Sequence, residues 1–168
     1  MYLKTVGGNS TFLLNIPPNK AGVIHENDLE VLNQLAEKIQ QVKDQHLIKQ
    51  AQLQLSSAIS DIQLDDLLSD EASFWQSQSD DQAPWIKVVW ETEQLLHRIV
   101  LKEAIQASQR VEAFTVYYEE AGEYKIATKG TIIGYQKILE FAPIQTKKIR
   151  VVFDAFRGAP TITQINLN

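Results

Sequence analysis

The sequence predicts a mainly β protein, in which an antiparallel β-sandwich follows a single strand and one α-helix. From Trp85 onward, apolar residues recur with a period of two in short runs separated by Gly, Pro, Gln and Ser, which is typical of antiparallel sandwiches. A strand followed by one helix is the repeat unit of a (β/α) barrel, and one such unit cannot bury itself. We therefore predict two parts: 1–45, the last unit of a barrel, and 46–168, the sandwich.

The N-terminal part has the pattern of a buried strand and a surface helix. Thr11–Ile16 is a continuous apolar run, typical of a strand covered on both faces, and two prolines end it. Asn27 or Asp28 can cap a helix that extends to about Lys43. The apolar stripe of this helix comprises Leu29, Leu32, Leu35, Ala36 and Ile39. Because Thr11–Ile16 has no neighbouring strand, we expect it to be disordered, folded back onto the sandwich, or paired in a dimer.

Short alternating runs define the sandwich. The predicted strands are 85–90, 98–102, 113–118, 124–127, 136–139, 149–153 and 161–167. A segment rich in Gln and Ser, 45–60, leads into the first strand, and 61–70 is an acidic loop or a short helical turn. Trp90 shares the inward phase of Ile86 and Val88, so it is predicted to lie in the core. Trp85 is out of this phase and is predicted to lie exposed or at the rim.

The composition argues against several classes of function. The 168 residues carry a net charge of −5, from 16 basic and 21 acidic residues, and form no basic stripe that could neutralise phosphates. We therefore expect no nucleic-acid partner. No run approaches the roughly 18 apolar residues of a membrane-spanning helix, so no membrane partner is expected either. Cysteine is absent, which excludes disulfides, thiolate catalysis and zinc–thiolate sites.

Three ordered motifs carry a resemblance to a known family. They are the opening TFLLNIPPNKAGVIHEND, LKEAIQASQRVEAF (Leu101–Phe114) and GTIIGYQKI (Gly130–Ile138). Together they resemble the C-terminal region of α-L-fucosidases of glycoside hydrolase family 29, where the last barrel strand and helix precede a discoidin-like β-sandwich. Two positions depart from the family pattern: Ser108 stands where the family tends to have glycine, and Ile132 where it tends to have threonine.

The resemblance implies both a fold and a function. The sandwich is expected to be a galactose-binding, discoidin-like jelly roll. The chain is expected to be a C-terminal accessory domain of a retaining fucosidase, with the catalytic barrel of the same protein and fucosylated glycans as its partners. Two alternatives stay open: an autonomous carbohydrate-binding module for fucose- or galactose-containing glycans, and a structural domain that binds nothing. For the parent enzyme, the resemblance implies a periplasmic or extracellular location.

We assign no catalytic residue to this chain. Retaining glycoside hydrolysis needs two carboxyl groups about 5 Å apart. The resemblance places both of them before Gly7, so this chain alone is expected to be inactive. Adjacent acids such as Asp65 and Asp66 are usually solvated loop residues and do not replace such a pair.

The candidate carbohydrate-binding residues are Trp75, Trp85 and Arg110. Sugar rings stack on exposed aromatic side chains because the rings offer a large apolar area. The guanidinium of Arg110 can instead tie loop carbonyls together, or bind a carboxylate such as that of Glu103. For all three candidates, a purely structural role is the competing interpretation.

Two further candidates concern a pocket edge and a metal. His25 follows the strand-to-helix turn, on the side where barrel active sites lie, so it can line a barrel-mouth edge or serve the entry into the helix. Discoidin-like domains often carry calcium, and the local candidate is Asp70 in the segment Ser69–Ser73. We otherwise expect no cofactor and no metal.

Overall fold

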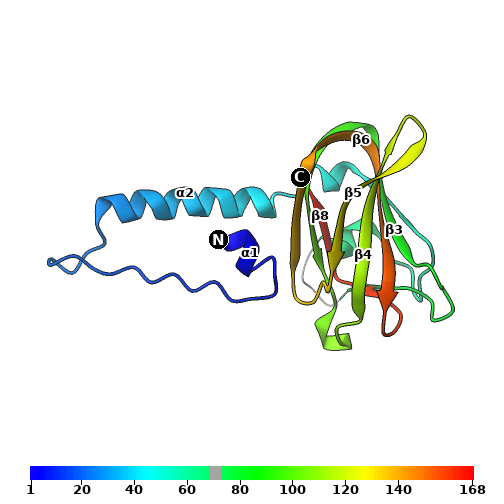
Figure 1. Ribbon diagram of the computed structural model, residues 1–168, viewed down its shortest axis with the longest axis horizontal. Helices are drawn as coiled ribbons and strands as arrows, with labels where there is room; N and C mark the ends of the chain where they lie inside the picture. Colours follow the sequence, from blue (N-terminus) through cyan, green and yellow to red (C-terminus); the bar gives the residue numbers. More distant parts are fainter. Residues whose placement is uncertain (69–72) are drawn as a thin grey trace.

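A layered antiparallel β-structure with one projecting helix forms the chain in the computed structural model, which describes residues 1–68 and 73–168 (Figure 1). The helices are α1 (Tyr2–Thr5) and α2 (Glu26–Lys43), with short 3₁₀ turns η1 (Ile48–Gln50), η2 (Leu64–Leu67) and η3 (Ile105–Ala107). The strands are β1 (Gln52–Leu55), β2 (Trp75–Gln76), β3 (Trp85–Lys102), β4 (Val111–Glu120), β5 (Glu123–Thr131), β6 (Lys137–Phe156), β7 (Thr161–Ile162) and β8 (Gln164–Leu167). Neither α1 nor α2 combines the length and apolar character needed to cross a membrane.

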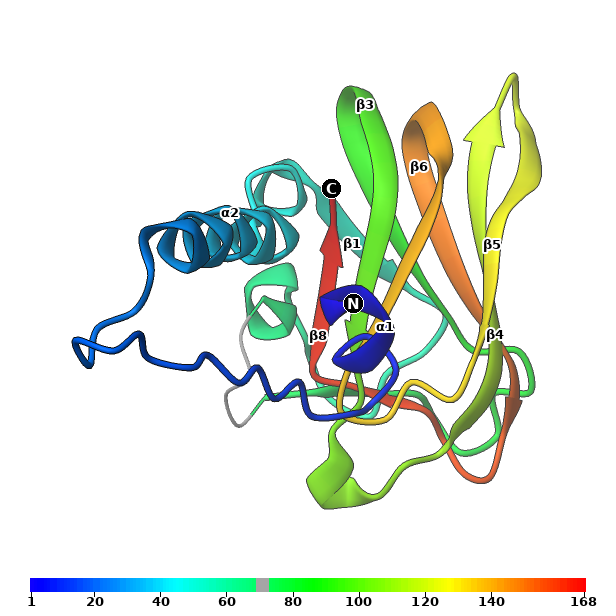
Figure 2. The ribbon, with the colours of Figure 1, turned by 60° about the vertical axis from the view of Figure 1, so that its left-hand side comes forward.

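The larger sheet has the strand order β1-β3-β6-β4-β5, and β8 pairs with the last residues of β3. A second, two-stranded sheet consists of β2 and β7, and all pairs are antiparallel. Strands β3 and β6 bend midway, so that their two halves contribute to different layers (Figure 2). The separate strands predicted at 85–90 and 98–102 are therefore one strand. Irregularities in the register, between Val89 and Gln94 and between Leu96 and Arg98, let the chain bend without leaving the ladder.

The core of the sandwich fills the space between the layers. The largest fully buried side chains include Trp75, Phe114 and Phe153, and the rings of Trp75 and Phe153 stack with centroids 5.5 Å apart. Trp90 is buried as predicted, and its indole N–H donates to the carbonyl of Leu47 at 2.8 Å. The prediction of a mainly β, antiparallel sandwich is confirmed.

Helix α2 begins slightly earlier than predicted. Its N-cap is His25, whose ring Nδ1 accepts a hydrogen bond from the backbone N–H of Asn27 at 3.2 Å. The helix ends at Lys43, as the sequence predicts. Val42 is its one buried residue, and the rest of its apolar stripe is exposed or half-buried, because α2 projects away from the sandwich (Figure 1).

The predicted strand at residues 11–16 is wrong for this chain. The segment is extended, but it forms no ladder with any described strand, so its backbone lacks the partners that would make it a strand. It runs beside α2 rather than folding back onto the sandwich, and Leu13 is 90% exposed. Dimer pairing through this segment stays a prediction.

Candidate functional site

A buried carboxylate joins the two motifs that lie within the sandwich. Glu103 is 2% exposed, and its Oε1 accepts hydrogen bonds from the backbone N–H groups of Arg110 at 2.8 Å and Val111 at 2.9 Å. Its Oε2 accepts from the N–H of Gly134 at 2.7 Å, while its own N–H donates to the carbonyl of Gly134. One side chain therefore fixes the start of β4 against the turn before β6.

The same turn holds the N-terminal segment. Asn9 lies in the left-handed region at φ 64°; its Nδ2 donates to the carbonyl of Ile133 at 2.9 Å, and its Oδ1 accepts from the N–H of Gln136 at 3.0 Å. Gly134 has φ +59°, and a Cβ there would lie 2.7 Å from Oδ1 of Asn9. Only glycine fits this junction without strain.

A cleft of about 480 Å³ lies where the N-terminal part meets the sandwich. Its walls include Tyr2 and Val42 on one side and Lys102, Tyr135 and Asn166 on the other. Tyr135 is 58% exposed, and the Lys102 ammonium lies 5.3 Å from the centroid of its ring. An exposed ring among amide and ammonium groups is the chemistry of a sugar-contacting surface.

The structure corrects one aromatic candidate. Trp75 has no exposed surface: Phe153 stacks on its ring, and its indole N–H donates to the carbonyl of Ser57 at 2.8 Å. The prediction that it contacts carbohydrate is wrong, because the small β2-β7 sheet carries it into the core. Trp85 is half-buried at the start of β3, with the Lys87 ammonium 5.0 Å from its ring, and its contact with a ligand stays a prediction.

Arg110 ties loops together, as one interpretation of the sequence expects. Its Nε donates to the carbonyl of Ala107 at 3.1 Å, and one of its terminal nitrogens donates to that of Ala159 at 2.8 Å. A direct contact of Arg110 with sugar stays a prediction. Glu103 meets the backbone of Arg110, not its guanidinium.

His25 serves the helix entry, since its ring accepts from the first turn of α2. A place at the edge of a barrel mouth stays a prediction. The calcium candidate Asp70 lies outside the described residues. Among the residues that the structure describes, no group of three His, Cys, Asp or Glu side chains is placed to hold a metal ion.

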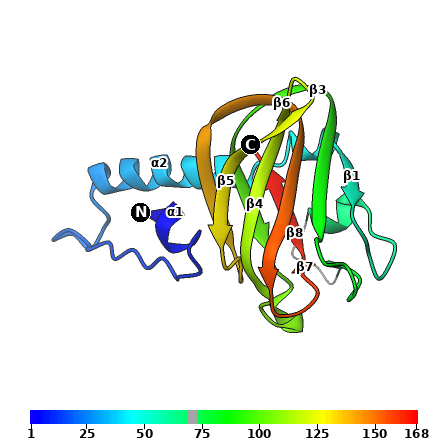
Figure 3. The ribbon, with the colours of Figure 1, turned by 45° about the vertical axis from the view of Figure 1, so that its right-hand side comes forward.

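The outward face of the larger sheet is open to solvent. Figure 3 shows its strands side by side from β5 to β1, with α2 to one side and not over them. Lys87 of β3 lies directly opposite Arg150 of β6, which in turn lies opposite Tyr117 of β4. The Arg150 guanidinium lies 4.5 Å from the ring of Tyr124 and 5.9 Å from that of Tyr117. We call Trp85, Lys87, Tyr117, Tyr124 and Arg150 the open-face cluster.

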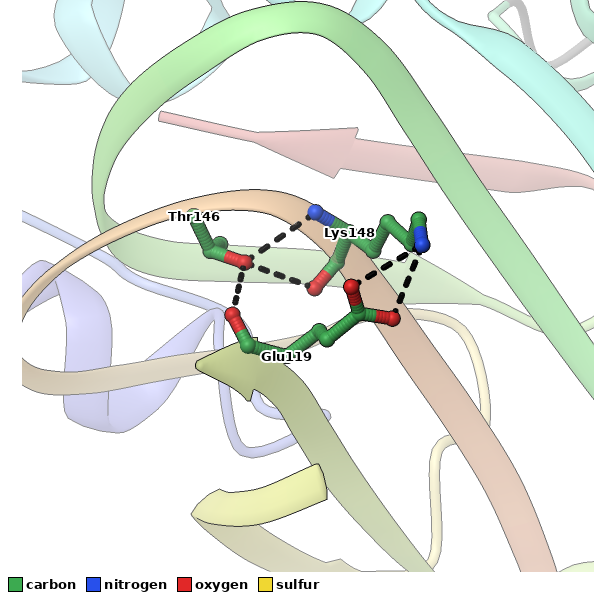
Figure 4. Close-up of polar contacts among 3 residues, drawn as sticks. All are labelled: Glu119, Thr146 and Lys148. Carbon is green, nitrogen blue, oxygen red and sulfur yellow. Dashed lines mark hydrogen bonds and ion pairs between the residues drawn. The ribbon is translucent and has the colours of Figure 1, made fainter. Parts of the chain in front are cut away.

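The neighbouring cation on this face is paired, in contrast to Arg150. Lys148 Nζ lies 2.9 Å from both carboxylate oxygens of Glu119, and the Thr146 hydroxyl donates to the carbonyl of Glu119 (Figure 4). The hydrogen bond to Glu119 raises the pKa of Lys148. The charge of Lys148 is therefore neutralised within the protein.

Comparisons with known proteins agree with this geometry. A family model for the F5/8 type C domain matches residues 52–166, and the chain belongs to this family. Alpha-L-fucosidase 1 of Arabidopsis thaliana is 27% identical over 176 residues, which cover 99% of this chain and 35% of the relative. The chain thus spans about a third of the length of this curated relative.

Solved structures extend these similarities. The crystal structure of SpGH29 is 31% identical, with a TM-score of 0.87 over 99% of this chain and 37% of that chain. The family 32 carbohydrate-binding module of C. perfringens NanJ, in complex with galactose, has a TM-score of 0.62 over 71% of this chain and 93% of that chain. At 13% identity, this last likeness shows the fold alone. The resemblance to the C-terminal region of family 29 α-L-fucosidases is confirmed.

Sequence reasoning missed three functional candidates. The sequence analysis assigns no role to Asn9, although asparagine can occupy the left-handed region more readily than most residues. Tyr135 belonged to a family motif but not to the binding prediction. Arg150 lies in a predicted strand, and only the pairing of β3 with β6 brings Lys87 opposite it.

Proposed function

We propose that this chain is the accessory, non-catalytic part of a longer α-L-fucosidase, in which it supports the catalytic barrel. Two facts support this proposal. Its relatives are α-L-fucosidases of which the chain spans about a third, and its fold is a discoidin-like sandwich with a helical appendage. The longer protein would cleave terminal α-L-fucose with retention, and its two carboxyl groups would lie outside this chain.

The exposed apolar side of the N-terminal part carries the proposal. Leu13 is 90% exposed and Val31 is 61% exposed, and Leu29, Val23 and Ile24 are exposed as well. Contiguous exposed apolar surface usually marks an interface. An extended segment and a helix with this pattern would complete a barrel if the remaining units covered them.

Hydrolysis of an aryl α-L-fucoside tests this proposal. We expect no hydrolysis by the chain alone and rapid hydrolysis by the longer polypeptide that contains it. In the longer polypeptide, Val31→Glu should lower the melting temperature, because a charge enters the covered interface. Asn33→Glu, at an exposed polar position of the same helix, is the matched control. Hydrolysis by the chain alone, or equal melting of both variants and the parent, would overturn the proposal.

A glycan-binding module is the second candidate, because Tyr135 lies exposed in the polar cleft. Calorimetry with L-fucose and with fucosylated and galactosylated oligosaccharides tests it. Heat of binding at millimolar ligand that Tyr135→Ala removes would favour this candidate. Absence of heat leaves scaffolding as the function of the sandwich.

A further inference from the structure

We propose that the open-face cluster binds an acidic glycan, a saccharide chain that carries carboxylate or sulfate groups. Arg150 and Lys87 would bind the anionic oxygens, and the neighbouring rings would contact the sugar. This site is separate from the cleft and from the exposed side of α2. The inference therefore does not depend on the proposed fucosidase.

The charges on this face are unbalanced. Lys87 and Arg150 lie directly opposite each other, and like charges at such a position repel. Within the described residues, neither side chain forms an ion pair, whereas neighbouring Lys148 is paired with Glu119. The chain as a whole carries a net charge of −5, so two adjacent cations on one face that are unpaired within the described residues are not expected from its composition. A bound anion would remove the repulsion.

The arginine is already held in place for such an anion. The rings of Tyr124 and Tyr117 lie 4.5 Å and 5.9 Å from its guanidinium, distances at which cation–π attraction restrains the side chain. Its Nε is buried and has no hydrogen-bond partner in the part of the chain that the structure describes. A restrained, unpaired guanidinium loses little entropy when it binds two oxygens of a carboxylate or sulfate.

The surroundings favour a sugar over other anions. Trp85 and the two tyrosines offer apolar ring surface, and Ile126 of β5 is 52% exposed beside Tyr117. Sugar rings pack on such surfaces through their CH groups. A polyphosphate would need more cations than Lys87 and Arg150, and it would approach the carboxylates of Glu119 and Asp154 on the same face. An extended glycan with separated charges fits this face.

Affinity electrophoresis of the purified chain in gels that contain polygalacturonate, dextran sulfate, polyglutamate or neutral dextran tests the proposal. We expect retardation by polygalacturonate or dextran sulfate, none by dextran, and loss of retardation as salt rises. Retardation by only one of these two acidic polysaccharides distinguishes carboxylate from sulfate recognition. Arg150→Gln and Lys87→Gln should each weaken binding about 10- to 100-fold.

Lys20→Gln is the matched control. It also removes one positive charge, but from the N-terminal part, which precedes all strands of the open-face cluster in the chain. Melting curves of all variants verify that each is folded. Equal weakening by Lys20→Gln would show a nonspecific charge effect and overturn the site. Retardation by neutral dextran, or by polyglutamate but neither polysaccharide, would overturn the glycan assignment, as would no retardation in any gel.

Discussion

The sandwich and the N-terminal part use similar apolar residues with opposite outcomes. In the sandwich, alternate positions such as Ile86, Val88 and Ile149 are fully buried. In α2, a comparable stripe ends at Val42, its one buried residue, while Leu29 and Val31 face solvent. Periodicity therefore predicts a helix or strand, whereas burial depends on which neighbours the chain itself contains.

The junction between the two parts is small but specific. Tyr2 and Leu3 of α1 pack against a minor cluster of Val42, Val100 and Ile138. Asn9 adds two hydrogen bonds to the turn that Glu103 also holds. The N-terminal part is therefore attached to the sandwich at one end and open along the rest.

The largest expected effect concerns Glu103 in the sandwich. Glu103→Ala should lower the free energy of unfolding by about 3–5 kcal/mol, because three backbone N–H groups lose their acceptor, two of them in buried surroundings. Urea denaturation measures this loss. Glu93→Ala, at an exposed position of β3, should stay within about 0.5 kcal/mol of the parent. A loss below about 1 kcal/mol in Glu103→Ala would contradict the role of this carboxylate.

Gly134→Ala should loosen the junction itself. The new Cβ would meet Asn9, and the backbone would remain at φ +59°, so we expect a loss of about 2–4 kcal/mol in unfolding free energy. Limited proteolysis should also cut residues 1–24 faster. Gly122→Ala has φ +86° but open space around its Cβ, and it should lose only about 1–2 kcal/mol. Equal losses would mean that the Asn9 contact is unimportant.

The carboxylate of Asp81 should make the stability of the sandwich depend on pH. Burial opposes ionisation, but hydrogen bonds from the hydroxyls of Ser56 and Ser57 and the N–H of Ala83 together lower the pKa of this carboxyl below 3.8. A lowered folded-state pKa means that the stabilisation is present above pH 3.8 and is lost as the pH falls through the folded-state pKa. Asp81→Asn should therefore lower the free energy of unfolding by about 1–2 kcal/mol at pH 7, with less difference in strong acid.

The control for this experiment is Asp80→Asn at the exposed neighbouring position. It should change the free energy of unfolding by no more than about 0.5 kcal/mol at either pH. A difference between Asp81→Asn and the parent that is constant with pH would show that the carboxylate charge is not involved.

The smallest expected change is an increase in the free energy of unfolding. Ser108 follows η3 at φ 78° and ψ 155°, a region that glycine adopts with least strain. Ser108→Gly should raise the free energy of unfolding by about 1 kcal/mol, measured in urea. Ser79→Gly, in a loop without positive φ, should not be stabilising. A destabilised Ser108→Gly would show that the hydroxyl matters more than the backbone.

Local patterns predicted much of this fold. Alternation gave the strands and the inward phase of Trp90, and the family motifs gave the discoidin-like sandwich. The sequence could not show that β3 and β6 are each one continuous, bent strand, because β-bulges have no clear signal in the composition. The sequence also could not show that Trp75 is buried, because the ring that stacks on it, Phe153, is distant along the chain.

The candidate sites were less predictable for the same reason. Arg110 tied loop carbonyls as its chemistry suggested, since that role needs only nearby backbone. The pairing of Lys87 with Arg150 depends on the register of strands more than 60 residues apart in the chain. The positive φ of Ser108, where the family tends to have glycine, likewise became visible only in the structure.

Hydrogen exchange measured by mass spectrometry tests whether the exposed apolar side of the N-terminal part is an interface. Residues 11–40 should exchange quickly in this chain, while strands β3, β4 and β6 remain protected. In the proposed longer polypeptide, residues 11–40 should become protected by at least about 100-fold, because the proposed barrel would cover their apolar side. Equal, fast exchange of residues 11–40 in both proteins would contradict the claim that this surface is an interface.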